Sequence, residues 1–310
     1  MNAVFLDADT LGNDVDLSPI KAVTGNLTLH SRTAPDQVMD RLKGFDTVLV
    51  NKVVLSRAHF EACPELKTIA VVATGLNNID KQAATDHGIR VMNVTNYGRS
   101  TVAQHTMALI LALATRLLDY DRDVRAGRWA RSDMFCLMDY PIMELEGKTL
   151  GIVGYGDLGQ GVAERARAFG LKVVLGCRPG QKPETVDGCS RISLDELLPQ
   201  VDVLSLHCLL TDETRHMIGA RELRMMKKEA LLINTSRGGL VDEQALADAL
   251  RAGTIGGAGF DVLTEEPPRN GNPLLANDIP NLIVTPHSAW ASREARQRIV
   301  EITARNLGGG

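Results

Sequence analysis

The sequence predicts an α/β protein that contains two doubly wound parallel sheets, each covered by helices. Short apolar runs of strand length alternate with helix-like segments along almost the whole chain. One long helical period interrupts this alternation near residue 100, and the alternation then restarts. The length of 310 residues suits two domains, and a hydrophobic content of 44% is sufficient for their cores.

The first alternating region lies before residue 98. Strands are expected at residues 3–6, 47–50, 68–73 and 90–93. Helices are expected between them at residues 35–42, 56–61 and 79–86. This rhythm favours a parallel sheet with helices on both faces, because each helical crossover returns the chain to start the next strand in the same direction.

The middle of the chain predicts one long helix from Ser100 to about Arg125, with Ser100 or Thr101 as its N-cap. A mixed segment follows, and the second alternating region then begins. Its strands are expected at residues 149–154, 172–176, 201–207, 230–234 and 282–285. Its helices are expected at residues 158–169 and 242–251, with a last helix at 291–306. We interpret the closing Gly308-Gly309-Gly310 as an unnatural or truncated tail.

Composition argues against several classes of partner. The formal net charge is −4 and no basic block stands out, so no nucleic acid is expected. The five cysteines are scattered without a Cys-x-x-Cys pair, so we expect no disulfide framework and no metal, and a reducing cytoplasm. There is no basic, apolar leader, and the most apolar stretch, residues 107–118, is short and contains Arg116, so no membrane is expected.

A glycine-rich turn follows the strand expected at residues 149–154. Gly154, Gly156 and Gly159 form a Gly-x-Gly-x-x-Gly pattern directly before a helix. Gly154 permits the tight turn, Gly156 lets the backbone approach a pyrophosphate, and Gly159 lets helix and strand pack. The amides of Asp157 and Leu158 would then face the phosphates. The alternative is a purely structural strand-to-helix turn.

The end of the next strand bears on the choice of dinucleotide. NAD sites usually place a carboxylate there for the ribose hydroxyls, but this chain has Cys177 followed by Arg178. A thiol adds no negative charge and a guanidinium can pair with a 2′-phosphate, so NADP(H) is favoured over NAD(H). The alternative is that Arg178 stacks on the adenine while NAD(H) still binds.

Three polar segments follow later strands, and they contain Arg237, Glu266 and His287. Ligands of open α/β sheets bind at the carboxyl ends of the strands, so these three side chains could meet in one crevice. An arginine, a carboxylate and an imidazole together can hold an acid substrate and transfer a proton.

The order of these motifs, a glycine loop, then Arg237, then Glu266 before a proline, then His287 after a proline, closely resembles the D-isomer-specific 2-hydroxyacid dehydrogenase family. The resemblance extends from about residue 72 to Trp290. Residues 135–142 and 147–150 look most like bacterial glycerate dehydrogenases, also called hydroxypyruvate reductases. The resemblance implies hydride transfer between NAD(P)H and a small 2-keto or 2-hydroxy acid.

The resemblance also implies roles for these residues. His287 would be the proton donor, Glu266 would hydrogen-bond its other ring nitrogen and fix its orientation, and Arg237 would hold the substrate carboxylate and polarise the carbonyl. The backbone amides of Thr74 and Gly75 would bind the carboxylate from the other side. Further substrate contacts are expected from Lys52, although a lysine in this position is more often an ordinary exposed residue, and from Trp290, which could equally pack between domains. Further cofactor contacts are expected from Cys208, Thr214, Thr235, Asp261 and His287.

The implied architecture has two Rossmann-like or flavodoxin-like domains with a cleft between them. Residues 1–98 with 291–310 would form the substrate domain, and residues 99–290 the dinucleotide-binding domain. A helix and arm at about 100–141 would form a homodimer interface. Because the family usually has an acid at the position of Cys177, this departure puts NAD(H) in doubt. Reductases of other 2-keto acids, and a corepressor-like dinucleotide sensor without catalysis, remain alternatives.

Overall fold

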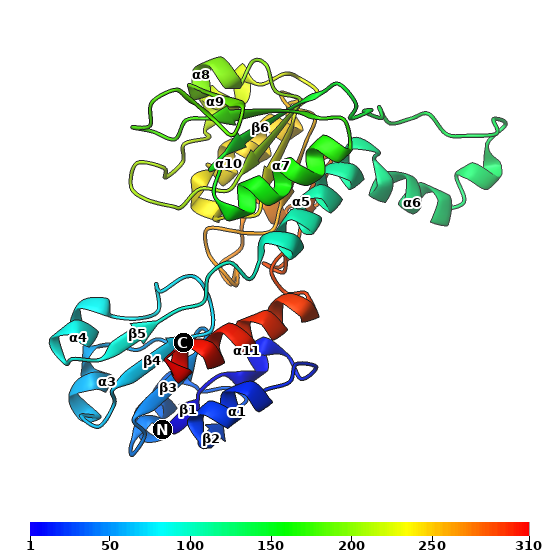
Figure 1. Cartoon of the computed structure of the whole chain (residues 1–310). Helices are drawn as coiled ribbons and strands as arrows, with labels where there is room; N and C mark the ends of the chain where they lie inside the picture. Colours follow the sequence, from blue (N-terminus) through cyan, green and yellow to red (C-terminus); the bar gives the residue numbers. More distant parts are fainter. Residues whose placement is uncertain (310) are drawn as a thin grey trace. The chain divides into compact units, whose positions relative to one another are not determined.

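The computed structural model describes residues 1–309, and the chain divides into two compact units. Unit 1 consists of Met1–Gly98 and Trp290–Gly310, and unit 2 consists of Arg99–Ala289 (Figure 1). Unit 1 is therefore built from both ends of the chain, with unit 2 inserted between them.

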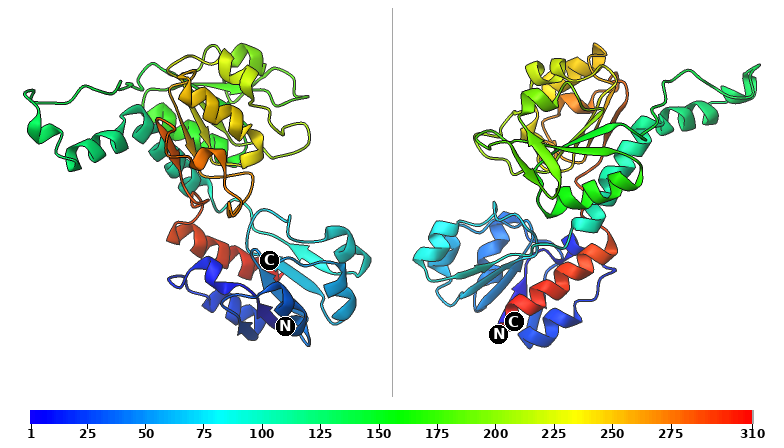
Figure 2. Two further views of the ribbon diagram at one scale, coloured as in Figure 1. Left: turned by 180° about the vertical axis from the view of Figure 1, so that it is seen from behind. Right: turned by 45° about the horizontal axis from the view of Figure 1, so that its top comes forward.

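Unit 1 contains a five-stranded parallel sheet in the order β2-β1-β3-β4-β5. Its strands are β1 (Asn2–Phe5), β2 (Asn26–Leu29), β3 (Thr47–Val50), β4 (Thr68–Val71) and β5 (Arg90–Met92). Its helices are α1 (Ser18–Thr24), α2 (Val38–Leu42), α3 (Arg57–Ala62), α4 (Lys81–Asp86) and α11 (Arg293–Gly308), with 3-10 turns at Ala8–Leu11 and Pro35–Gln37. One core joins the sheet to α2, α3 and α4, and a second joins it to α1 and α11, so both faces are covered (Figures 1 and 2).

Unit 2 contains an eight-stranded sheet in the order β13-β12-β11-β10-β6-β7-β9-β8, in which only β8 runs antiparallel to its neighbour. The strands are β6 (Thr149–Val153), β7 (Lys172–Gly176), β8 (Glu184–Val186), β9 (Cys189–Ile192), β10 (Val203–Leu206), β11 (Leu231–Asn234), β12 (Gly257–Phe260) and β13 (Leu282–Val284). The strand order reverses between β6 and β10, and in doubly wound sheets this switch point is where a ligand crevice opens.

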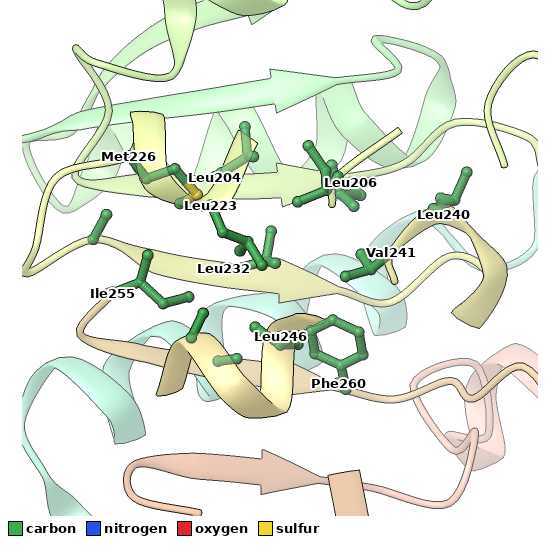
Figure 3. Packing of buried hydrophobic residues seen from close by; sticks show 14 of the residues in the cluster. Leu204, Leu206, Leu223, Met226, Leu232, Leu240, Val241, Leu246, Ile255 and Phe260 are labelled. Atoms are coloured by element: carbon green, nitrogen blue, oxygen red, sulfur yellow. The ribbon is translucent and has the colours of Figure 1, made fainter. Parts of the chain in front are cut away.

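Helices cover both faces of the unit 2 sheet. They are α5 (Arg99–Ala114), α6 (Leu117–Arg125), α7 (Asp157–Ala168), α8 (Leu194–Leu197), α9 (Ala220–Met225) and α10 (Glu243–Arg251), with 3-10 turns at Trp129–Arg131, Gly238–Leu240 and Pro273–Leu275. On one face, Leu206 of β10, Leu232 of β11 and Phe260 of β12 pack with Leu246 of α10 (Figure 3). On the other face α5 and α7 complete a second core. The sheet is therefore buried on both sides, which holds the strand ends in fixed positions.

The long helix expected from Ser100 to about Arg125 is wrong in two respects. It is broken into α5 and α6, with a bend of 60°. Arg116 lies at the break with a φ of 54°, and a left-handed residue interrupts the helical hydrogen-bond ladder. The helix also begins at Arg99, so Ser100 and Thr101 lie in its first turn and neither is the N-cap.

The segment after the break projects away from the unit 2 sheet as an arm, residues 117–142 (Figures 1 and 2). Tyr140 braces the arm, because its hydroxyl donates to Asp123 and its ring lies under the Arg116 guanidinium, 4.9 Å from the ring centroid. In the part of the chain that the structure describes, no single helix has the length and apolar character needed to cross a membrane. The bent pair α5 and α6 together passes that test on length and composition alone.

Several other boundaries differ from the sequence-based expectations. The strand β2, the helix α1 and the β8–β9 hairpin were not predicted. β2 is half exposed and four residues long, so it lacks the apolar run that identifies a buried strand. The last helix begins at Arg293 rather than at residue 291, because Ser292 caps it by accepting the amide of Ala295, and it continues to Gly308.

Candidate functional site

The glycine loop between β6 and α7 lies at the switch point of the unit 2 sheet. Gly154 has a φ of 98°, and a Cβ there would lie 2.5 Å from the backbone nitrogen of Cys208 at the end of β10. A Cβ at Gly159 would lie 2.2 Å from the carbonyl oxygen of Gly154. Gly156 differs, because a Cβ there would meet nothing within 4 Å. Two glycines are therefore required by packing, and the third opens space in front of the helix.

The first turn of α7 faces this open space. The helix has twelve residues, begins at Asp157, and has no side chain capping its first amides. Uncapped amides and the positive end of the helix dipole favour an anion. Asp157 itself is paired with Arg99 of α5 at 3.2 Å, which holds its carboxylate. The loop therefore fits a dinucleotide pyrophosphate, with Leu158 in the same turn.

The ribose end of the site carries no acid. Cys177 directly follows β7 and is buried, and burial raises the pKa of its thiol, so the group stays uncharged. Arg178 is exposed beside it, and within residues 1–309 no carboxylate lies within ion-pair distance of its guanidinium. The position of the usual carboxylate is therefore neutral and an exposed arginine follows it, while the charges of Glu184, Glu196 and Arg191 also act on the Cys177 thiol.

His207 and Cys208 directly follow β10 on the other side of the switch point. The His207 Nε2 lies 2.8 Å from the Ser205 hydroxyl, while its Nδ1 is buried without a hydrogen-bond partner in the described chain. Burial lowers the pKa of His207 to about 4 and raises the pKa of Cys208 to about 11. Both groups are therefore neutral near pH 7, so this wall of the crevice adds no charge.

The two threonines expected at the cofactor site already have hydrogen-bond partners. The Thr214 hydroxyl donates to the carbonyl of Leu209 at 2.8 Å and accepts the amide of Thr211 at 2.7 Å. The Thr235 hydroxyl lies 3.1 Å from that of Thr106 on α5. The hydrogen bonds of these two hydroxyl groups therefore hold the loops after β10 and β11 in place.

The structure brings His287 and Glu266 together at the carboxyl edge of the unit 2 sheet. The Nδ1 of His287 lies 2.6 Å from Oε2 of Glu266, and Oε1 accepts the backbone amide of Leu263 at 2.8 Å. Burial acts to raise the pKa of Glu266, but the hydrogen bonds from His287 and Leu263 and the charge of Arg237 outweigh it, so the pKa lies below 4.5. The carboxylate is charged near neutrality, and the Nε2 of His287 is the nitrogen left to face a substrate.

Arg237 follows β11 and is tied to its own loop. Its Nη1 donates to the carbonyl of Ser236 at 2.7 Å, and its carbonyl accepts the side-chain amide of Asn234 at 2.9 Å. A Cβ at Gly238 would lie 2.1 Å from the carbonyl carbon of Leu263. This glycine lets the Arg237 loop pack against the loop that leads to Glu266, and it was not singled out from the sequence.

Asp261 holds the segment that carries His287, residues 285–289, here named the His287 loop. Its buried carboxylate accepts the Thr285 hydroxyl at 2.5 Å, the amide of Ser288 at 2.9 Å and the amide of Ala289 at 2.8 Å. The loop forces His287 to a φ of 53°. A non-glycine residue in this region costs about 1–2 kcal/mol, so the surrounding contacts must hold it there.

Unit 1 has a polar group of its own at the ends of β1 and β3. The buried carboxylate of Asp7 accepts the backbone amides of Asn51, Lys52 and Val53, at 2.8, 2.6 and 3.1 Å. Asp7 was not among the residues predicted from the sequence. These three bonds fix the loop that carries Lys52, whose side chain is exposed.

The loop after β4 carries Thr74 and Gly75. The Thr74 hydroxyl donates to the carbonyl of Val94 at 2.9 Å. Asn78 ties this loop to the Lys52 loop by donating to the carbonyl of Val53 at 2.8 Å. Trp290 is partly buried and packs against the unit 1 core formed with α1 and α11.

Known proteins resemble the chain over nearly its whole length. A sequence profile described as the NAD binding domain of D-isomer specific 2-hydroxyacid dehydrogenases matches residues 107–289. Glycerate dehydrogenase of Methylorubrum extorquens is 45% identical over 304 residues, which are 98% of this chain and 94% of that protein. Hydroxypyruvate reductase of Blautia hydrogenotrophica is 37% identical over 311 residues, which are 99% of this chain and 96% of that protein.

A solved structure also resembles this chain over nearly its whole length. The D-lactate dehydrogenase of Aquifex aeolicus, crystallised with NAD and lactic acid, superposes with a TM-score of 0.81 at 31% identity and covers 99% of this chain and 94% of that one. The expected doubly wound fold and nicotinamide-dependent reaction class are thereby confirmed. This chain belongs to the D-isomer specific 2-hydroxyacid dehydrogenase family, and residues 107–289 are its NAD binding domain.

Proposed function

We propose that this protein is a hydroxypyruvate and glyoxylate reductase, or glycerate dehydrogenase in the reverse direction, and that it prefers NADPH. The observation that carries the proposal is the His287–Glu266 pair, 2.6 Å apart, at the sheet edge that also presents Arg237. The names of the relatives support the substrate, since these include glycerate dehydrogenase and hydroxypyruvate reductase.

The side chains of unit 2 perform the acid–base part of the reaction. The bound nicotinamide supplies the hydride that adds to the keto carbon. Arg237 binds the substrate carboxylate and polarises the carbonyl, because its guanidinium can donate to both groups. His287 then donates the proton on Nε2 to the carbonyl oxygen, and its charge in the protonated form is balanced by Glu266. The products are the hydroxy acid and the oxidised cofactor, and solvent returns the proton to His287.

We assign substrate recognition to unit 1. The amides of Thr74 and Gly75 lie in the loop after β4, and Lys52 lies in the loop after the adjacent strand β3. Backbone amides and an ammonium group at neighbouring strand ends suit a carboxylate. We also assign a substrate contact to Trp290, whose side chain packs against the unit 1 core.

We assign the cofactor to the glycine loop and the surrounding strand ends. Gly154, Gly156, Gly159 and the amides of Asp157 and Leu158 would hold the pyrophosphate. The adenosine ribose would lie at Cys177 and Arg178. The remaining contacts would come from the loops of Cys208, Thr214, Thr235, Asp261 and His287.

The preference for NADPH rests on charge. A buried neutral thiol at Cys177 does not repel a 2′-phosphate, and the exposed guanidinium of Arg178 can bind one. A carboxylate at the same place would favour the ribose hydroxyls of NAD and repel the phosphate.

We further propose a homodimer in a reducing cytoplasm. The arm exposes a series of large apolar side chains, which are Leu117, Leu118, Val124, Trp129, Met134, Phe135, Met138 and Ile142. Exposed apolar surface of this extent is typical of a protein interface, and a second copy of the chain is the partner that we propose. The five free cysteines suit a reducing compartment.

The test is the initial rate of NADPH and NADH oxidation, measured in parallel with hydroxypyruvate, glyoxylate and pyruvate. We expect the fastest turnover with hydroxypyruvate and NADPH. Faster turnover with pyruvate would replace the substrate while keeping the reaction class. Dinucleotide binding without turnover of any acid would overturn the proposal in favour of a sensor.

A further inference from the structure

We propose that His105, in the middle of α5, is a positioning residue for His287 and acts through the hydroxyl of Thr285. The inference rests on the proposed function, because it concerns the residue that would donate the proton. His105 had no partner that the sequence could identify, and it is not part of the glycine loop or of the pair formed by His287 and Glu266.

His287 is held in place through the backbone of its own loop. Asp261 binds Thr285 on one side of His287 and the amides of Ser288 and Ala289 on the other. His287 itself has a left-handed backbone with a φ of 53°, which costs a non-glycine residue free energy that the surrounding contacts must offset. The direction of its ring therefore depends on the arrangement of Asp261 and Thr285.

His105 fixes this arrangement of Asp261 and Thr285. The Nε2 of His105 lies 3.0 Å from Oγ1 of Thr285 and 3.6 Å from Oδ1 of Asp261. The Thr285 hydroxyl gives its hydrogen to Asp261, so its oxygen can only accept from His105, and His105 must carry a proton on Nε2. The result is a chain of hydrogen bonds from His105 through Thr285 to Asp261.

The helix α5 is a rigid support for this chain of hydrogen bonds. Thr101, one helical turn before His105, donates to the carbonyl of Ala289 at 2.9 Å, the last residue of the His287 loop. Thr106 meets Thr235, close in sequence to Arg237, at 3.1 Å. The helix is packed into the unit 2 core through Leu109, Ile110 and Leu113. One face of α5 thus holds both loops that carry the proposed proton donor and the proposed carboxylate binder.

His105→Met and His105→Gln form a matched pair for the test. The two side chains have similar length and shape, but only glutamine keeps a nitrogen donor near the place of Nε2. We expect His105→Met to lower kcat about tenfold, since misplacement of a reacting group by a fraction of an ångström has effects of this order. We expect the KM for the keto acid and the Kd for NADPH to stay within about twofold, and His105→Gln to recover most of kcat.

A second variant tests the route through Thr285. Thr285→Val removes the hydroxyl with little change of shape, and should lower kcat by a similar factor. Adding His105→Met to it should lower kcat little further, because both changes break the same chain of hydrogen bonds. Fully multiplicative effects would overturn the proposed route.

A measurement that needs no turnover separates this inference from the proposed function. Amide hydrogen exchange of a peptide covering residues 285–289 should be faster in His105→Met than in the wild-type protein and in His105→Gln, because the amides of Ser288 and Ala289 lose their fixed acceptor. If the wild-type protein reduces no keto acid, the proposed function fails while the exchange result still stands. Unchanged exchange with unchanged kcat in His105→Met, or an equal loss of kcat in His105→Gln, would overturn the positioning role.

Discussion

The carboxylate of Glu266 links the imidazole ring of His287 to the backbone of the loop that carries Glu266. One oxygen lies 2.6 Å from the Nδ1 of His287 and the other accepts the amide of Leu263 at 2.8 Å. A carboxylate that is fixed at both oxygens cannot turn with the ring, so it selects one orientation of the imidazole. Glu266 and His287 therefore act as one unit in the proposed reaction.

Replacing His287 with alanine should remove proton donation and leave the cofactor site intact. We expect kcat to fall by about 10²–10⁴, the range that general acid catalysis supplies, with an almost unchanged Kd for NADPH. Steady-state kinetics and fluorescence titration measure the two quantities. His87→Ala changes an exposed histidine that directly follows α4; it is the control and should keep full activity. Equal losses of affinity and turnover would show that His287 is structural.

Replacing Glu266 with glutamine should lower kcat while retaining the bond to Leu263. Glutamine can still accept the amide of Leu263, but it then presents an NH₂ group to His287 and no longer balances its charge. We expect a loss of about 10- to 100-fold. Glu265→Gln is the control, because Glu265 is exposed and contacts only the Asn270 side chain among the hydrogen bonds described.

The lowered pKa of Glu266 also fixes the sign of a pH effect. Its folded pKa lies below the ordinary 4.5, so the charged pair is fully present above that value and is lost only as the pH falls through the still lower folded pKa. The profile of kcat/KM for the wild-type enzyme should therefore contain no step from this carboxylate above about pH 5. A carboxylate step near neutrality that disappears in Glu266→Gln would contradict this assignment.

The sequence predicted the parts of the site that local patterns encode. Arg237, Glu266 and His287 each follow a strand of the parallel part of the sheet, and parallel strands present their carboxyl ends at one edge. The glycine loop has its own spacing rule. His105 carried no such signal, because its partner Thr285 lies 180 positions away and only the packed sheet brings them together. The same reason applies to Asp7, whose three backbone donors come from the loop after β3.

The broken helix shows a second limit of sequence patterns. Apolar residues continue from α5 into α6, so the period alone predicts one helix. The break occurs at Arg116, which has no intrinsic preference for a left-handed backbone. Its side chain instead binds Asp119 and the ring of Tyr140, and these tertiary contacts hold the unusual backbone.

Arg178→Ala should separate the two cofactors. A hydrogen-bonded arginine–phosphate pair contributes about 1.5–3 kcal/mol, so the Kd for NADPH should rise about 10- to 100-fold while the Kd for NADH changes little. Cys177→Asp should lower the Kd for NADH, because it places the usual carboxylate beside the ribose hydroxyls. Titrations of both cofactors with both variants provide the measurement. Equal effects of Arg178→Ala on the two cofactors would sink the 2′-phosphate assignment.

Phe135→Ser should weaken the proposed dimer. Phe135 of the arm is 87% exposed, and Met138, three residues later, is 80% exposed. We expect the variant to dissociate at protein concentrations where the wild-type protein is dimeric, as measured by light scattering after size exclusion. Leu275→Ser is the control, since this exposed leucine lies outside the arm. A wild-type protein that is monomeric at every concentration tested would contradict the dimer.

His207 should make the stability of the protein fall as the solution becomes acidic. Burial lowers its pKa from 6.5 to about 4, so between these values the unfolded chain binds a proton that the folded chain does not. The free energy of unfolding should therefore decrease by up to about 1.4 kcal/mol per pH unit as the pH falls through this window, with no contribution from His207 above it.

His207→Gln removes the titrating group and keeps a donor that can reach the Ser205 hydroxyl. Denaturant unfolding of both proteins from about pH 4 to 8 gives the comparison, and the wild-type protein should lose more stability than the variant only on the acid side. Parallel stability curves across the whole range would mean that the His207 ring is hydrated or protonated without cost in the folded protein.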